Sequence, residues 1–218
     1  MTSIRNEFVT CALCGGQTPV RVLISTSSFG SPDLDLRPSE LARSTISMWV
    51  QRCASCGYCA PSISEAMPDT RKVVESTEYR ALLEHSGFPE LARSFLCSSL
   101  VFQTCGERVA AVRAAVEAAW ACDDEGAVAE SIHCRVLAVR LLRECSNDRD
   151  SVLPDPHTEC AVIADLLRRA ELFDDAIAVI DDVVEGAPRG IATMLAFSRL
   201  RALARDPGRY TVDDAMSN

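Results

Sequence analysis

Apolar and polar residues alternate in two short stretches near the start of the chain. Residues 20–24 read V-R-V-L-I, and residues 46–50 read I-S-M-W-V. A period of two places every second side chain on one face of an extended strand. The pattern therefore predicts two β-strands, and the second of them runs into Cys53.

From about Asp69 the apolar spacing becomes helical, with steps of three and four residues, as at Val128, Ile132 and Val136. Glycine and proline interrupt this pattern at Gly87, Gly106, Gly126, Pro154/Pro156 and Gly186/Pro188. Helices are predicted at about 70–85, 88–104, 107–121, 126–145, 157–171, 174–185 and 189–204. Short links between them imply antiparallel neighbours. The predicted fold is α+β and predominantly α, with a β-rich domain over residues 1–65 and an α-helical domain over residues 66–218.

One pair of the predicted helices resembles a tetratricopeptide (TPR) repeat, whose length is 34 residues. Residues 157–190 have this length, and the motif's preferred small, aromatic, alanine and proline positions fall on Ala164, Phe173, Ala176 and Pro188. The motif's tryptophan position is occupied by Cys160. TPR-like hairpins or an unrelated helical bundle both fit the pattern.

Charge is distributed unevenly along the 218 residues, which carry a net charge of −9. Residues 1–65 have as many arginines as acids, so the negative charge lies in the helical part. An acidic surface repels phosphate backbones, which argues against nucleic acid as a partner. No stretch is long and apolar enough to predict a membrane span, and without a signal-peptide pattern at the N-terminus we expect a reducing, cytoplasmic location.

Four of the eleven cysteines form two Cys-x-x-Cys pairs, each followed by glycine: C-A-L-C-G at 11–15 and C-A-S-C-G at 53–57. Four thiolates in two such turns are a typical ligand set for tetrahedral Zn²⁺. Glycine after the second cysteine lets the chain turn back. We predict one structural Zn²⁺ held by Cys11, Cys14, Cys53 and Cys56 in a zinc ribbon. An iron–sulfur centre that includes Cys59, a dithiol redox pair and metal-free cysteines are the alternatives.

Cysteines and histidines elsewhere in the chain have no recognised catalytic or metal-binding spacing. Free cysteine is commonly buried, so the cysteines of the helical part are predicted to fill the core. His157 and Cys160 lie three residues apart on one helical face and could contribute to a second metal site, with His133 and Cys134 as further candidates. We predict no catalytic residue.

The segment F-G-S-P-D-L-D-L-R-P, residues 29–38, has alternating charged residues at Asp33, Asp35 and Arg37. In extended backbone all three side chains point to one side. They could form a recognition loop. Alternatively, Arg37 could pair with an aspartate and anchor the long insertion.

Taken together, several motifs resemble a bacterial family named domain of unknown function 2225. They are V-T-C-A-L-C-G, the 29–38 segment, W-V-Q-R-C-A-S-C-G-Y, A-A-W-A-C-D-D and L-L-R-R-A-E-L-F-D-D-A. The Cys-x-x-Cys turns of that family usually have proline after the first cysteine, where this chain has Ala12 and Ala54. The resemblance implies a Cys-x-x-Cys ribbon joined to TPR-like helices, with metal at Cys11, Cys14, Cys53 and Cys56, and it implies no reaction.

These features favour a zinc-binding protein whose helices bind a protein or peptide. The alternatives are an enzyme with a site between ribbon and helices, and a regulator that uses the ribbon on nucleic acid.

Overall fold

The computed structural model describes residues 1–147, 153 and 155–217. The chain divides into two compact units. The first comprises residues 1–28 and 40–134, and the second comprises residues 29–39 and 135–218. This grouping differs from the predicted division at residue 65, because helices α1 to α4 belong with the cysteine turns and residues 29–39 belong with the later helices. The fold class is α+β and predominantly α, as predicted.

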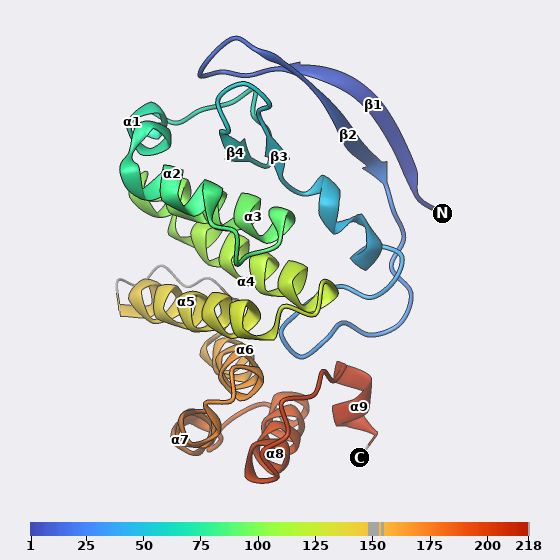
Figure 1. The fold of residues 1–218 in the computed structure, drawn as a ribbon. Helices are drawn as coiled ribbons and strands as arrows, with labels where there is room; N and C mark the ends of the chain where they lie inside the picture. Colours follow the sequence, from blue (N-terminus) through green and yellow to red (C-terminus); the bar gives the residue numbers. More distant parts are fainter. Residues whose placement is uncertain (148–152, 154, 218) are drawn as a thin grey trace. The chain divides into compact units, whose positions relative to one another are not determined.

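The first unit begins with a long antiparallel hairpin of β1 (Ser3–Thr10) and β2 (Gln17–Ser25) (Figure 1). Strand β2 confirms the predicted strand at residues 20–24. The turn between β1 and β2 contains Cys11 and Cys14. A second, very short hairpin pairs β3 (Gln51–Arg52) with β4 (Cys59–Ala60), and its turn contains Cys53 and Cys56. Both Cys-x-x-Cys pairs therefore lie in turns between antiparallel strands.

The predicted strand at residues 46–50 is wrong. This stretch begins with the second half of a 3₁₀ helix, η1 (Arg43–Met48). Local hydrogen bonds favour the helical turn: the Thr45 hydroxyl donates to the Ala42 carbonyl at 2.7 Å and accepts from Trp49 Nε1 at 2.8 Å. The Trp49 ring then meets Trp120 edge-on, with ring centroids 6.3 Å apart. Burial of Ile46 and Val50 is satisfied without a partner strand.

Four helices complete the first unit: α1 (Thr70–Glu75), α2 (Thr77–Glu84), α3 (Glu90–Thr104) and α4 (Arg108–Asp124). The single helix predicted at 70–85 is divided at Ser76, whose backbone is extended (ψ 152°) and whose side chain caps α2 by accepting from the Tyr79 N–H. Helices α3 and α4 pack along each other with alanines at the contact, among them Ala111, Ala115 and Ala118, which are fully buried. Helix α5 (Val128–Asn147) contributes residues to both units.

The second unit is built on α6 (Pro156–Arg169), α7 (Phe173–Val183) and α8 (Arg189–Leu203), which match the predicted helices closely. Asp155 caps α6 by accepting from the N–H groups of His157 and Thr158. A short helix, α9 (Val212–Met216), was not predicted; it begins with a capping box of Thr211 and Asp214. The predicted break at Pro154 lies outside the described residues. No described helix is long and apolar enough to cross a bilayer.

Residues 29–39 are a structural part of this second unit. The Leu34 N–H donates to the Tyr210 carbonyl at 3.0 Å, and the Val212 N–H donates to the Pro32 carbonyl at 2.9 Å. Leu34 packs with Phe197 and Ala215 in a small buried cluster. The segment is thus built into the helical unit, between α8 and α9.

Candidate metal centre

The four predicted ligands converge. The Sγ atoms of Cys11, Cys14, Cys53 and Cys56 all lie within 4.8 Å of one another. Between the two turns, the Sγ atoms of Cys11 and Cys56 lie 3.7 Å apart and those of Cys14 and Cys53 lie 3.6 Å apart. A tetrahedral ion with Zn–S bonds of about 2.3 Å would separate its sulfurs by about 3.8 Å. The sulfur atoms thus have the spacing that one tetrahedral ion requires.

The two cysteine turns have the same internal hydrogen bonds. We name them the first knuckle (residues 11–16) and the second knuckle (residues 53–58). In each, the N–H of the first cysteine donates to the carbonyl five residues later, at 2.9 Å in the first knuckle and 2.8 Å in the second. In each, the glycine N–H donates back to the carbonyl of the first cysteine at 2.9 Å. The two glycines have nearly equal positive φ, 72° at Gly15 and 76° at Gly57, which explains why glycine follows each pair.

Backbone N–H groups also point at the sulfur atoms in both knuckles. Cys11 accepts from the N–H groups of Leu13 and Cys14, and Cys53 accepts from those of Ser55 and Cys56. The second cysteines accept from Gly16 and Tyr58. Such hydrogen bonds stabilise thiolate, the form that binds metal.

The thiols respond differently to this environment. Burial raises the pKa of Cys11 and, more strongly, that of Cys56. Burial opposes ionisation of Cys53 as well, but the N–H groups of Cys56 and Ser55, together with the Cys56 and Cys14 thiols, outweigh it and lower its pKa to about 6. Of Cys11, Cys53 and Cys56, Cys53 is therefore the thiol that most readily becomes a thiolate ligand.

Residues outside the two sequence motifs hold the knuckles in place. The buried Tyr79 hydroxyl donates to the Gly57 carbonyl and accepts from the Cys59 N–H, each at 2.9 Å. Arg80 donates to the Cys56 carbonyl at 2.9 Å, and Arg71 donates to the Leu13 carbonyl. These arginines place positive charge beside a set of four thiolates. Sequence patterns gave no indication of these contacts, because α1 and α2 come near the knuckles only in the folded chain.

The N–H group that follows the first cysteine is satisfied in both knuckles. The Ala12 N–H donates to the Ile63 carbonyl at 2.8 Å, and the Ala54 N–H donates to the Thr18 hydroxyl at 3.1 Å. Each knuckle therefore has a contact to a residue distant in sequence. Proline at either position would remove the donor, so the two alanines suit this chain.

The other predicted metal ligands do not converge in the same way. Within the described residues, the four knuckle cysteines are the group of three or more ligand side chains that come together. Cys160 donates to the Val179 carbonyl at 3.3 Å, and burial raises its pKa to about 11. His157 Nδ1 lies 3.7 Å from Asp155 Oδ1 at the start of α6. The geometry gives His157 and Cys160 a structural role.

Asp33, Asp35 and Arg37 are buried, each at most 2% exposed. Asp35 forms an ion pair with Arg169 of α6 at 2.5 Å, and the Arg37 N–H donates to Asp35 Oδ1 at 3.3 Å. A side chain buried in this way does not present itself to a partner. Burial thus favours the anchoring interpretation of the 29–38 segment over recognition, with Arg169 as an anchor that the sequence did not reveal.

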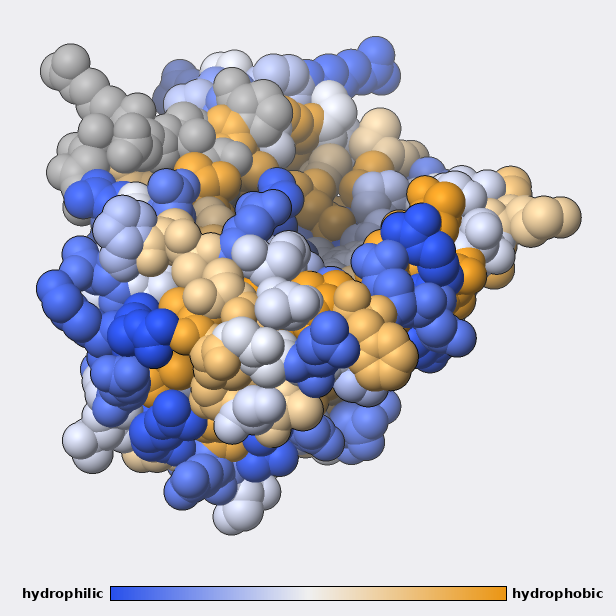
Figure 2. All heavy atoms as spheres, turned by 90° about the horizontal axis from the view of Figure 1, so that it is seen from above, coloured by the Kyte–Doolittle hydropathy of each residue, from blue (hydrophilic) through white to orange (hydrophobic). Residues whose placement is uncertain are grey.

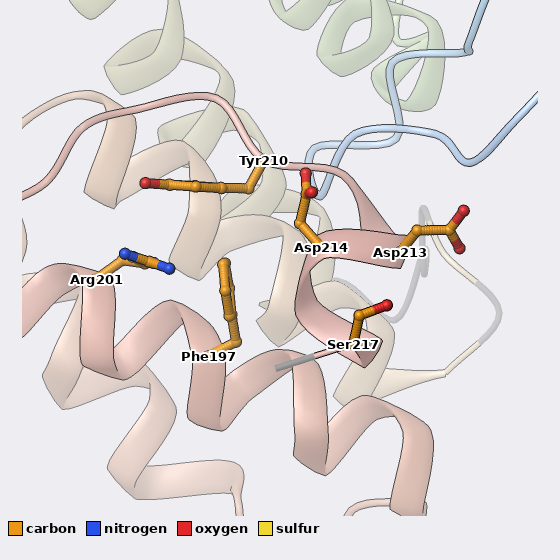
Figure 3. A pocket seen from close by; sticks show the side chains of 6 residues that line it. All are labelled: Phe197, Arg201, Tyr210, Asp213, Asp214 and Ser217. Carbon is orange, nitrogen blue, oxygen red and sulfur yellow. The ribbon is translucent and has the colours of Figure 1, made fainter.

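A cavity of about 290 Å³ lies between α8 and α9 (Figure 3). The Arg201 guanidinium lies against both the Phe197 and the Tyr210 ring, 4.8 and 4.7 Å from their centroids, and the two rings meet edge-on at 5.1 Å. Asp214 on its rim is engaged in the capping box of α9. Arg201, Tyr210 and Asp214 at this cavity already make local contacts, which leaves the knuckle cysteines as the strongest candidate site.

In comparisons with known proteins, no family model, no curated protein and no solved structure matches this chain.

Proposed function

We propose that this chain is a zinc-binding protein in which Cys11, Cys14, Cys53 and Cys56 hold one structural Zn²⁺, and whose helical unit binds a protein or peptide. The observation that carries the proposal is the convergence of four sulfur atoms within 4.8 Å from two knuckles of matching geometry. Four thiolates complete the coordination of Zn²⁺, so no position is left for water or substrate. A structural role follows from this closed set, even though Cys14 is exposed.

Zinc is favoured over the alternatives by the number and arrangement of the ligands. Tetrahedral four-sulfur sites suit zinc or iron. Cys59, which an iron–sulfur cluster could recruit, points its thiol at the Gly57 carbonyl at 3.4 Å and is fully buried beside Tyr79. A dithiol redox pair would need only one of the two knuckles. The matching second knuckle is explained only if one ion uses both.

Metal content of the purified chain tests the zinc proposal. We expect one zinc per chain by elemental analysis combined with native mass spectrometry, and its loss in Cys53→Ser. Cys105→Ser is the matched control, because Cys105 is a half-buried cysteine outside the knuckles and should leave the zinc content unchanged. Iron in place of zinc, or full zinc retention in Cys53→Ser, would contradict the proposal.

The helical unit supports the interaction part of the proposal. Ala164 of α6 and Ala176 of α7 are fully buried and let the helices approach closely, in the positions where a TPR repeat prefers small residues. A shallow cavity of about 380 Å³ opens on this pair. Apolar side chains of α6 and α7 line it, with charged ones beside them: Ile163, Val179, Val183, Cys160, Pro156, Arg143 and Glu159. Such a surface fits an apolar peptide segment better than a phosphate backbone.

A charge placed in this cavity tests the interaction. Val179→Glu changes a half-buried residue of α7 that lines the cavity. Val184→Glu makes the same change at an exposed residue directly after α7 that does not line the cavity. Affinity capture from the native cell compares the three proteins. We expect wild type and Val184→Glu to retain the same protein partner, and we expect Val179→Glu to lose it. If all three retain the same partners, the cavity is not the binding surface.

A further inference from the structure

Strand β1 (Ser3–Thr10) has a neighbour on one side only. In the part of the chain that the structure describes, its sheet contains β1 and β2 alone. The other strand carries Pro19, which lacks an N–H and makes the outer edge of β2 a poor pairing edge. Strand β1 contains no proline, so its outer edge can pair with a further strand.

Proline also determines which groups of β1 face outward. Pro19 lies opposite Phe8. Because Pro19 cannot donate, this pair cannot exchange the two hydrogen bonds of a hydrogen-bonded pair. The N–H and C=O of Phe8 then point away from β2, and by alternation those of Asn6 and Ile4 do so as well.

The side chains of β1 form a self-complementary pattern about Asn6. Ile4 and Phe8 are 41% and 72% exposed and lie on the face that also carries Asn6. Figure 2 shows that apolar side chains are exposed among polar ones on the face that it draws. Arg5 and Glu7 lie on the opposite face and pair with each other at 2.7 Å. From residue 4 to residue 8 the strand reads apolar, basic, neutral, acidic, apolar. When it is paired with its own reversed copy, apolar residues lie opposite apolar ones and the basic residue lies opposite the acidic one.

We propose that β1 pairs antiparallel with β1 of a second copy of this chain, about a two-fold axis at Asn6. Residue 4 then lies opposite residue 8 of the partner, and residue 5 lies opposite residue 7. Each Ile4 meets a Phe8 on one face, and each Arg5 meets a Glu7 on the other, so the four charges alternate in sign. The two hairpins become one four-stranded sheet with an isologous interface.

Among two-fold axes at Arg5, Asn6 and Glu7, the charges select the one at Asn6. In antiparallel pairing, the side chains of directly opposite residues lie on the same face of the sheet. The two-fold axis must therefore lie midway between the two copies of one residue, because any other position would place residues of different faces opposite each other. An axis at Arg5 places Arg5 opposite its own copy, and an axis at Glu7 does the same for Glu7. Like charges directly opposite are destabilising. The axis at Asn6 avoids both and aligns the outward-facing N–H and C=O groups.

The distribution of charge favours a second copy as the occupant. The chain carries −9, but residues 1–65 are balanced, so the two copies would meet at their neutral ends. A pairing strand of eight residues buries less than the ~800 Å² per partner of a standard interface. A dimer with a dissociation constant in the micromolar range is therefore expected.

Charge reversal with cross-rescue tests the proposal on the full-length, metal-loaded chain by sedimentation equilibrium. Arg5→Glu places two acids opposite two acids, and Glu7→Arg places two bases opposite two bases. We expect each variant alone to weaken dimerisation by at least about tenfold. An equimolar mixture of the two should form a heterodimer about as well as wild type, because every opposite pair is again of unlike charge. Lys72→Glu, an equal charge change at a highly exposed residue outside the hairpin, is the control.

The outcomes separate clearly. Heterodimer rescue supports pairing through β1, and it cannot arise from misfolding of either variant. A wild-type chain that stays monomeric to high micromolar concentration overturns the proposal and leaves the edge to a strand of another protein. Dimerisation that both charge reversals leave unchanged also overturns it, since the interface would then lie elsewhere. The metal content of each variant, measured in parallel, keeps this result independent of the zinc proposal.

Discussion

The Asp35 carboxylate accepts a hydrogen bond from Arg169 Nη1 at 2.5 Å, across 134 residues of sequence. Both side chains are nearly or fully buried, at 0% and 6% exposed. The pair joins the 29–39 segment to α6 within the second unit. A charge pair buried so completely is costly to break, because removing one partner leaves the other buried with one ion-pair contact fewer.

Asp35→Ala is expected to destabilise the second unit by about 3–5 kcal/mol. The matched control is Asp181→Ala, which breaks the exposed pair of Asp181 with Arg199 and should change stability little. Urea unfolding followed by circular dichroism measures both variants. Equal effects of the two substitutions would show that the Asp35–Arg169 pair does not anchor the segment.

Gly57→Ala is expected to be more damaging than Gly15→Ala. Both positions have positive φ, which costs a residue with a side chain about 1–2 kcal/mol. A Cβ at Gly15 meets nothing within 4 Å, whereas a Cβ at Gly57 would lie 2.5 Å from Leu83 Cδ2. Thermal unfolding of the zinc-loaded chain should show the larger loss for Gly57→Ala. In a Leu83→Ala background the two glycine variants should become similar, and a persistent difference would refute the steric explanation.

Tyr79→Phe is expected to loosen the second knuckle. The substitution leaves the Gly57 carbonyl and the Cys59 N–H without their shared partner, at a cost of about 1–3 kcal/mol. We expect zinc affinity to fall by roughly tenfold or more, as is typical when a supporting residue of a metal site is lost. Competition with a colorimetric chelator measures it. Tyr210→Phe is the control, since it removes a single hydrogen bond, to Asp206 Oδ2 in the second unit, and should leave the metal affinity unchanged.

Glu117→Gln is expected to flatten the dependence of stability on pH. Burial raises the pKa of Glu117 from 4.5 to about 7, against an opposing effect of Arg113. A carboxyl with a higher pKa in the folded state contributes stability that is fully present below pH 4.5 and is lost as pH rises through about 7. The glutamine stays neutral at every pH. The unfolding free energy of the variant, relative to that of wild type, should therefore be greater at pH 8 than at pH 5, by on the order of 1–3 kcal/mol. Denaturant midpoints across this range measure the effect, with the exposed Glu125→Gln expected to follow wild type.

The sequence by itself determined the features that arise from local chemistry. Cys-x-x-Cys followed by glycine contains all that the local structure needs. It supplies two thiols, the turn that directs them to one side, and a residue that tolerates positive φ. Helices α3 to α8 were also predictable, because their apolar spacing and their glycine and proline breaks act within a few residues.

Only the tertiary structure decided the remainder. The alternation at residues 46–50 was correct as a pattern, yet a strand needs a partner, and here Trp49 is held by Thr45 and Trp120 instead. By sequence alone Asp33, Asp35 and Arg37 could belong to a recognition loop or to an anchored insertion, and only the structure shows that all three are buried and that Asp35 pairs with Arg169. Tyr79 gave no signal as a support of the second knuckle. Each of these outcomes depends on contacts between residues that are far apart in sequence. The free energy of such contacts cannot be read from the local sequence pattern.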